Sequence, residues 1–196
     1  VIYKNIMKED ELLEKVKNLQ DDYYKENKKN TFFKKAQKYD CAKTVSTNLD
    51  VITLLKNTMY FLPNSTDLYF HYPLFKTFAN PENFETIVMY FVNLCKNFLE
   101  EVGTFNLHIN WVGYTISAHQ RYMPLYDLFI RLGRAHNFAL EYSLKNLYLY
   151  NPPNVLDQIE VLIRPIIAPG IQKKIRIISK AESQTQLTNL FNSFIN

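Results

Sequence analysis

The sequence predicts an α/β protein with a mixed sheet of about five strands, flanked by helices. Short segments with apolar residues at period two alternate along the chain with longer segments whose apolar residues recur at helical spacing. Strands that alternate with helices form βαβ units, which give parallel strand pairs. The 196 residues are enough for one well-filled hydrophobic core.

The N-terminal part is predicted to be a short helical extension. Residues 8–29 carry apolar side chains at helical spacing on an otherwise charged segment, namely Leu12, Val16, Leu19 and Tyr23. Residues 25–43 are basic and polar, with two embedded phenylalanines, and fit either a loop or an irregular helix. We therefore assign residues 1–45 to a helical extension and residues 46–196 to the main domain.

The main domain begins with two predicted strands. Thr58–Leu62 has an extended pattern, and Leu68–Tyr72 is a strand that Pro73 ends. The clearest helix follows, with Asn80 as its N-cap, Pro81 in its first turn and Gly103 at its end. Its apolar stripe consists of Phe84, Ile87, Val88, Phe91, Leu94, Cys95, Phe98 and Leu99.

The central strand is predicted over Phe105–Val112. Its alternation places Phe105, Leu107, Ile109 and Trp111 on one face and turns His108 to the other, where a satisfied structural role is expected. Ser117 is expected to cap the next helix, Ala118–His136. The stripe of that helix is Tyr122, Leu125, Tyr126, Phe129 and Leu132.

The C-terminal third has a strand, helix, strand, helix pattern. Leu147–Tyr150 is a short strand followed by Asn-Pro-Pro, and Ile175–Ile178 is a final strand. Between them lies a helical segment over 155–167 that Pro169 and Gly170 end. Its stripe is Val155, Leu156, Ile159, Leu162, Ile163 and Ile166, and a C-terminal helix carries Leu187, Leu190, Phe191 and Phe194.

The sequence contains no convincing catalytic or metal-binding pattern. Four scattered glycines form neither a dinucleotide fingerprint nor a phosphate loop, and the four histidines lack metal-ligand spacing. We therefore expect no enzyme activity, no metal and no cofactor. Two cysteines do not form a disulfide framework, and neither a signal peptide nor a membrane span is visible, which favours a cytoplasmic protein.

Two basic groups have more than one interpretation. One consists of Lys28, Lys29, Lys34, Lys35, Lys38 and Lys43, interleaved with Phe32 and Phe33, and the other of Lys173, Lys174, Arg176 and Lys180. Basic residues beside aromatic rings can contact an anionic membrane surface or single-stranded nucleic acid, or be an ordinary solvated surface. No nucleic-acid module accompanies them, so we do not expect nucleic acid as a partner.

The region from Leu68 to Lys180 resembles the CRAL-TRIO domain, the fold of yeast-type phosphatidylinositol transfer proteins and of tocopherol and retinaldehyde carriers. The strand Phe105–Thr115 ends in a glycine turn like the family's central strand, although Asn110 replaces the usual Asp. Two further pieces carry the resemblance in the family's order: Leu147-Tyr-Leu-Tyr-Asn-Pro-Pro, and Leu162-Ile-Arg-Pro-Ile-Ile leading to Lys173-Lys-Ile-Arg-Ile.

This resemblance implies non-catalytic binding, and transfer, of a phospholipid or other hydrophobic ligand in a cavity gated by helix 155–167. The expected ligand contacts are Tyr122, Tyr126, Phe129, Tyr148, Tyr150, Leu156, Ile159, Leu162, Ile163 and Ile166, with Lys174 as a headgroup contact. Glu141 lies one position away from the family's acidic headgroup residue, which weakens the case for phosphatidylinositol. The alternatives are a scaffold that binds protein partners with its cavity closed and a small enzyme of another type. Peripheral membrane association is compatible with the ligand-binding interpretation.

Overall fold

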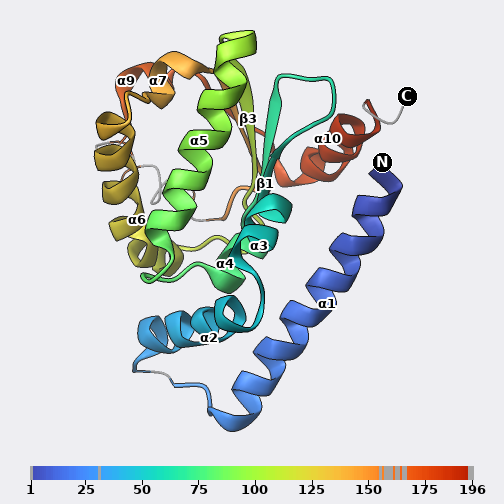
Figure 1. Cartoon of the computed structure of the whole chain (residues 1–196), viewed down its shortest axis with the longest axis vertical. Coiled ribbons are helices and arrows are strands. Elements are labelled where there is room, and N and C mark those ends of the chain that lie inside the picture. Colours follow the sequence, from blue (N-terminus) through green and yellow to red (C-terminus); the bar gives the residue numbers. More distant parts are fainter. Residues whose placement is uncertain are drawn as a thin grey trace.

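The computed structural model of the chain describes residues 2–30, 32–154, 156, 161, 164 and 167–193, with side chains from Asp10 onward. It contains a five-stranded mixed sheet flanked by helices, which confirms the predicted fold class (Figure 1). The strands lie in the order β1-β2-β3-β4-β5. Their bounds are Met59–Phe61, Asp67–His71, Phe105–Asn110, Leu144–Tyr150 and Ile175–Ile177.

The sheet combines one antiparallel pair with three parallel pairs. β1 and β2 are antiparallel and form a hairpin, whereas β2, β3, β4 and β5 are parallel neighbours. The helices α4 (Tyr72–Phe78) and α5 (Phe84–Val102) connect β2 to β3, and α6 (Ile116–Ala135) and α7 (Leu140–Ser143) connect β3 to β4. Both crossovers advance across the sheet in the same direction, so the right-handed rule places them on one face.

Figure 1 shows the two long crossover helices, α5 and α6, side by side on one side of the strands. The short helix α9 (Pro169–Gln172) precedes β5, and α10 (Lys180–Asn192) ends the described chain. Leu187 of α10 packs with Tyr69 and Tyr150 in a small apolar cluster that is separate from the main core. The sheet therefore has a well-covered face under α5 and α6 and a second face that α10 covers in part.

Three helices precede the sheet: α1 (Ile2–Glu26), α2 (Lys34–Asn48) and α3 (Val51–Thr58). The second half of the basic segment 25–43 is thus the start of a regular helix, α2. Leu12, Val16 and Val45 belong to the same hydrophobic core as the sheet and α5. Residue 45, the expected end of the extension, lies inside α2, and the extension and the main domain share this core.

Two helix starts differ from the sequence prediction, and the helix α4 was not predicted. Asn83 rather than Asn80 is the N-cap residue of α5, because Asn80 instead forms a turn in which its backbone N–H donates to Asn83 Oδ1 at 3.0 Å. The N-cap of α6 is Thr115, whose hydroxyl accepts the Ala118 N–H at 3.1 Å, so Ser117 lies within the helix. Pro73 ends β2 and also lies in the first turn of α4.

Two glycines hold backbone conformations that other residues rarely adopt. Gly103 has φ +83° and ends α5 as predicted, and Gly113 has φ +75° in the turn after β3. A Cβ atom at Gly113 would lie 2.6 Å from Lys76 Nζ. The turn that leads from β3 into α6 therefore depends on glycine. Within the described residues, no helix is long and apolar enough to cross a membrane.

Candidate ligand-binding site

The two faces of the sheet differ in chemistry. Strand alternation and cross-strand register place apolar side chains on the face under α5 and α6, which we call the apolar face. These are Phe105, Leu107, Ile109, Leu147, Leu149, Ile175 and Ile177. The opposite face, which we call the polar face, carries Asp67, Tyr69, Asn106, His108, Asn146, Tyr148, Tyr150 and Arg176.

The apolar face is least buried at its β5 edge. Ile177 is 47% exposed, and Ile109 and Ile175 are half-buried, whereas Leu149 between them is 5% exposed. The register Ile109, Leu149, Ile177 across β3, β4 and β5 makes these side chains neighbours in one row. A row of branched apolar side chains with partial exposure is a suitable wall for a lipophilic ligand.

The three residues predicted on α6 lie on the apolar side of the sheet. Tyr122 is enclosed in the core, with its ring centroid 5.0 Å from that of Phe75. Phe129 is half-buried and packs edge-on against Phe91 at 5.6 Å. Tyr126 is half-buried and closest in character to a ligand contact, because its ring is apolar while its hydroxyl forms a hydrogen bond.

The hydroxyl of Tyr126 belongs to a small buried network. Its oxygen lies 2.7 Å from the Tyr114 hydroxyl, which in turn lies 3.2 Å from His119 Nδ1. Burial raises the pKa of Tyr126 to about 12, so the group is a neutral phenol at physiological pH. This network can offer a neutral hydrogen-bond partner and no charge.

The two tyrosines predicted on β4 point to the polar face instead. Tyr148 stacks on His108, with ring centroids 4.7 Å apart, and Tyr150 is buried with α10. The sequence alternates Leu-Tyr-Leu-Tyr here, so one set of side chains must face each way, and the apolar face receives Leu147 and Leu149. The predicted contacts on α6 and on β4 are therefore on opposite faces of the sheet.

A hydrogen-bond network fills the centre of the polar face. His108 Nε2 lies 2.9 Å from Asp67 Oδ1, and His108 Nδ1 lies 2.9 Å from the Tyr150 hydroxyl. Asn106 also donates to Asp67 Oδ1 at 2.9 Å, and Asn146 donates to Asn106 at 3.1 Å. The hydrogen bond from His108 is the main reason that the pKa of Asp67 lies below its usual value.

This arrangement gives His108 the structural role expected of it. Because an ionised carboxylate only accepts hydrogen bonds, Nε2–H of His108 donates to Asp67, and Nδ1 faces the Tyr150 hydroxyl. Sequence analysis placed His108 on this face but could not identify Asp67, which lies on a different strand. The described residues contain no group of three histidine, cysteine, aspartate or glutamate side chains that could hold a metal ion.

Lys174 and Glu141 meet where α7 and α9 approach the start of β5. Lys174 Nζ donates to the backbone oxygens of Glu141 at 2.6 Å and Leu144 at 2.7 Å. The Glu141 carboxylate accepts the N–H of Gly170, in the first turn of α9, at 3.0 Å. Both groups therefore fix the segment that returns from residue 167 to β5. Among the described residues Lys174 Nζ has two acceptors, which leaves one ammonium N–H for a ligand.

The predicted gate segment 155–167 lies mostly outside the described residues. Within it Leu156 is described: it is half-buried, and its N–H donates to the Pro153 oxygen at 3.1 Å. The other predicted contacts on the segment lie outside the described part of the chain, namely Ile159, Leu162, Ile163 and Ile166. Pro169 and Gly170, which were expected to end the gate helix, form the first turn of α9.

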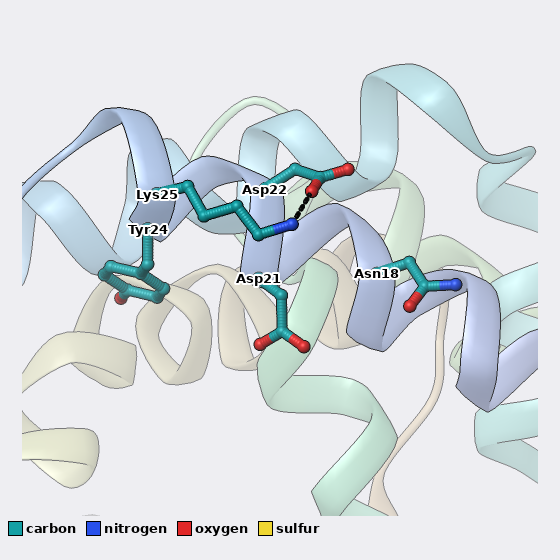
Figure 2. Close-up of a pocket in the computed structure, with 5 residues that line it drawn as sticks. All are labelled: Asn18, Asp21, Asp22, Tyr24 and Lys25. Atoms are coloured by element: carbon teal, nitrogen blue, oxygen red, sulfur yellow. Dashed lines mark hydrogen bonds and ion pairs between the residues drawn. The ribbon is translucent and has the colours of Figure 1, made fainter.

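A separate surface pocket of about 530 Å³ lies along α1 (Figure 2). Its lining combines polar and apolar surface, and Lys25 forms an ion pair with Asp22 at 2.7 Å on the same helix. The lining residues are Asn18, Asp21, Asp22, Tyr24 and Lys25. Pockets for lipophilic ligands are lined predominantly by apolar side chains, whereas four of these five residues are polar or charged.

Comparison with known proteins adds one finding. The family model described as CRAL/TRIO domain matches residues 64–194, which is more than half of the chain and runs from the start of β2 through α10. No curated protein matches the sequence.

Proposed function

Because the chain belongs to the CRAL/TRIO domain family, whose members bind lipophilic molecules, we propose that it holds a lipid-like ligand against the β5 edge of its apolar face. The carrying observation is the row Ile109, Leu149 and Ile177, which is apolar throughout and partly exposed at Ile109 and Ile177. Tyr126 and Phe129 of α6 supply the adjoining wall. Binding is non-covalent, and the ligand is not altered.

We propose that segment 155–167 covers this ligand. It joins two parallel neighbours, β4 and β5, and a right-handed crossover between them belongs on the face that carries α5 and α6. Its residues Leu156, Ile159, Leu162, Ile163 and Ile166 would add apolar contacts from above. An acyl chain gains roughly 0.8 kcal/mol per buried methylene, so such a site needs few polar contacts for affinity.

The polar end of the ligand has a candidate partner in Lys174. Its third ammonium N–H, together with the positive charge, suits an anionic headgroup such as the phosphate of a phospholipid. Phosphatidylinositol is one member of this class. Release or uptake would then require the covering segment to move away from the sheet, at a membrane surface.

Two neighbouring positions on β5 test the proposal, since Ile177 faces the apolar side and Arg176 the polar side. Both are exposed, so tryptophan at either position should permit folding. We expect the purified wild-type protein to yield a bound lipid on organic extraction and mass spectrometry, or to take up a labelled phospholipid. Ile177→Trp should reduce the bound fraction, and Arg176→Trp should not.

A protein with neither extracted nor incorporated lipid, or with equal loading in both variants, contradicts the proposed site. The first outcome supports the alternative function, a scaffold for protein partners with a closed cavity. The observation that favours this alternative is the packing of Phe129 against Phe91 and Phe138, which fills part of the space beside α6.

A further inference from the structure

The loop between α1 and α2 presents two adjacent phenylalanines to solvent. Phe32 is 92% exposed and Phe33 is 70% exposed, more than nearly all other large apolar side chains of the described residues. Single exposed apolar residues are common on protein surfaces, but two adjacent aromatic rings at the tip of a loop are an unfavourable arrangement in water. A partner that buries both rings away from water would therefore be favourable.

The loop is held in this shape by its own polar atoms. Asn30 Oδ1 accepts the backbone N–H groups of Phe32 and Phe33 at 2.8 and 2.9 Å. Gln37 on α2 accepts the Asn30 N–H at 2.8 Å and donates to the Lys28 oxygen, also at 2.8 Å. These four hydrogen bonds order the backbone without burying either ring, so the exposed rings are part of an ordered loop.

Positive charge surrounds the two rings. Residues 27–38 contain five lysines and no acidic residue. Lys28, Lys29, Lys34 and Lys35 are exposed, and within the described residues no carboxylate lies within ion-pair distance of these four. By contrast, Lys25 and Lys43, which flank the loop, pair with Asp22 and Glu82.

We propose that this loop, residues 28–30 and 32–35, docks the protein on an anionic lipid bilayer. The rings of Phe32 and Phe33 enter the interface between headgroups and acyl chains, and the lysines contact anionic headgroups. Lysines without a carboxylate partner in the described residues favour a negatively charged partner. The exposed rings favour a partner with an apolar layer beneath that charge, as a lipid bilayer has. This inference goes beyond ligand binding and does not depend on it.

The position of the loop keeps it separate from the ligand site. Figure 1 shows the α1–α2 connection at one end of the long axis of the molecule and α7 and α9, which meet beside the proposed headgroup contact Lys174, at the other. None of the loop residues 28–30 and 32–35 belongs to the hydrophobic core that includes Ile109 and Leu149. Substitutions in the loop should therefore leave lipid loading at the sheet unchanged. Failure of membrane docking and failure of ligand binding can thus be told apart in one set of variants.

The test is sedimentation of the purified protein with vesicles of phosphatidylcholine alone or with added phosphatidylserine. Wild-type protein should bind the mixed vesicles, and binding should weaken as salt is raised. Each lysine near an anionic leaflet strengthens binding about fivefold, so K28Q/K29Q/K34Q/K35Q should lose most of it. F32S/F33S should weaken binding on the order of a hundredfold by removing the inserted rings.

Matched controls change the same chemistry elsewhere on the surface. K15Q/K17Q/K56Q/K145Q removes four exposed lysines that belong to neither basic group, and I52S/V102S removes two exposed apolar side chains. Both should bind like wild type. The proposal is overturned if wild-type protein does not bind the mixed vesicles, or if control and loop variants bind equally. One further result overturns it: F32S/F33S keeps full vesicle binding, and the protein binds a single-stranded oligonucleotide through its loop lysines more tightly than it binds vesicles.

Discussion

Replacing Asp67 with asparagine tests the polar network at the centre of the sheet. Asp67 Oδ1 accepts hydrogen bonds from His108 and Asn106, each at 2.9 Å, and its side chain is 18% exposed. The variant keeps the shape and one acceptor oxygen but removes the charge. Hydrogen bonds to charged groups contribute about 1.5–3 kcal/mol, roughly twice a neutral one.

The expected loss of unfolding free energy for Asp67→Asn is therefore about 1.5–3 kcal/mol, the part of the two bonds that depends on charge. For a protein of this size each kcal/mol corresponds to about 2–4 °C in Tm, so the variant should melt about 3–12 °C below wild type. The fold should be retained, because the introduced amide oxygen can still accept one hydrogen bond.

The pH dependence of stability should change in the same variant. Since the folded-state pKa of Asp67 is lowered, its contribution is complete above the unfolded-state pKa of about 3.9 and is lost as pH falls through the folded value. The difference between wild type and Asp67→Asn should therefore be largest near neutral pH and shrink in acid. Urea denaturation at several pH values measures this difference directly.

A matched control is Asp22→Asn, which removes a carboxylate that is 67% exposed in a surface ion pair with Lys25. Exposed pairs of this kind contribute less than about 1 kcal/mol. The reasoning is refuted if Asp67→Asn loses no more stability than Asp22→Asn. A constant difference between wild type and Asp67→Asn from neutral pH to acid would refute the assigned role of the Asp67 charge.

Two further predictions concern groups with unusual surroundings. Gly170→Ala would place a Cβ atom 2.0 Å from Glu141 Oε1, so the hydrogen bond from the Gly170 N–H to Glu141, which anchors α9, must break. We expect the variant to exchange a labelled lipid between protein and vesicles faster than wild type. An unchanged exchange rate would contradict an anchoring role for this hydrogen bond. Arg121 is 5% exposed, stacks on Tyr122 with Cζ 4.8 Å from the ring centroid, and has no carboxylate within ion-pair distance in the described part of the chain. Because a buried unpaired charge is unfavourable, Arg121→Met should leave the unfolding free energy unchanged or raise it by about 1 kcal/mol. Urea denaturation measures this difference. A loss of unfolding free energy above about 2 kcal/mol would show that the guanidinium stabilises the fold.

Much of the architecture follows from local patterns in the sequence. The helical stripe of α5, its end at Gly103 and the alternation of β3 are properties of neighbouring residues, so their periods could be recognised without tertiary information. The exact helix starts were less accessible, because Asn80, Asn83, Thr115 and Ser117 are all suitable caps. Only the backbone path decides which of them occupies the N-cap position.

Contacts between strands could not be derived from the sequence in this way. Tyr148 and Leu149 are equally plausible ligand contacts in an alternating strand, and the packing of α5 and α6 on one face decides that the leucine faces them. His108 and Asp67 are 41 residues apart and meet only because β2 and β3 pair in one register. The sequence by itself determined the strands, the long helices α5 and α6, their order and the family. The tertiary structure decided which side chains share a face, because strand register is set by the packing of the whole sheet.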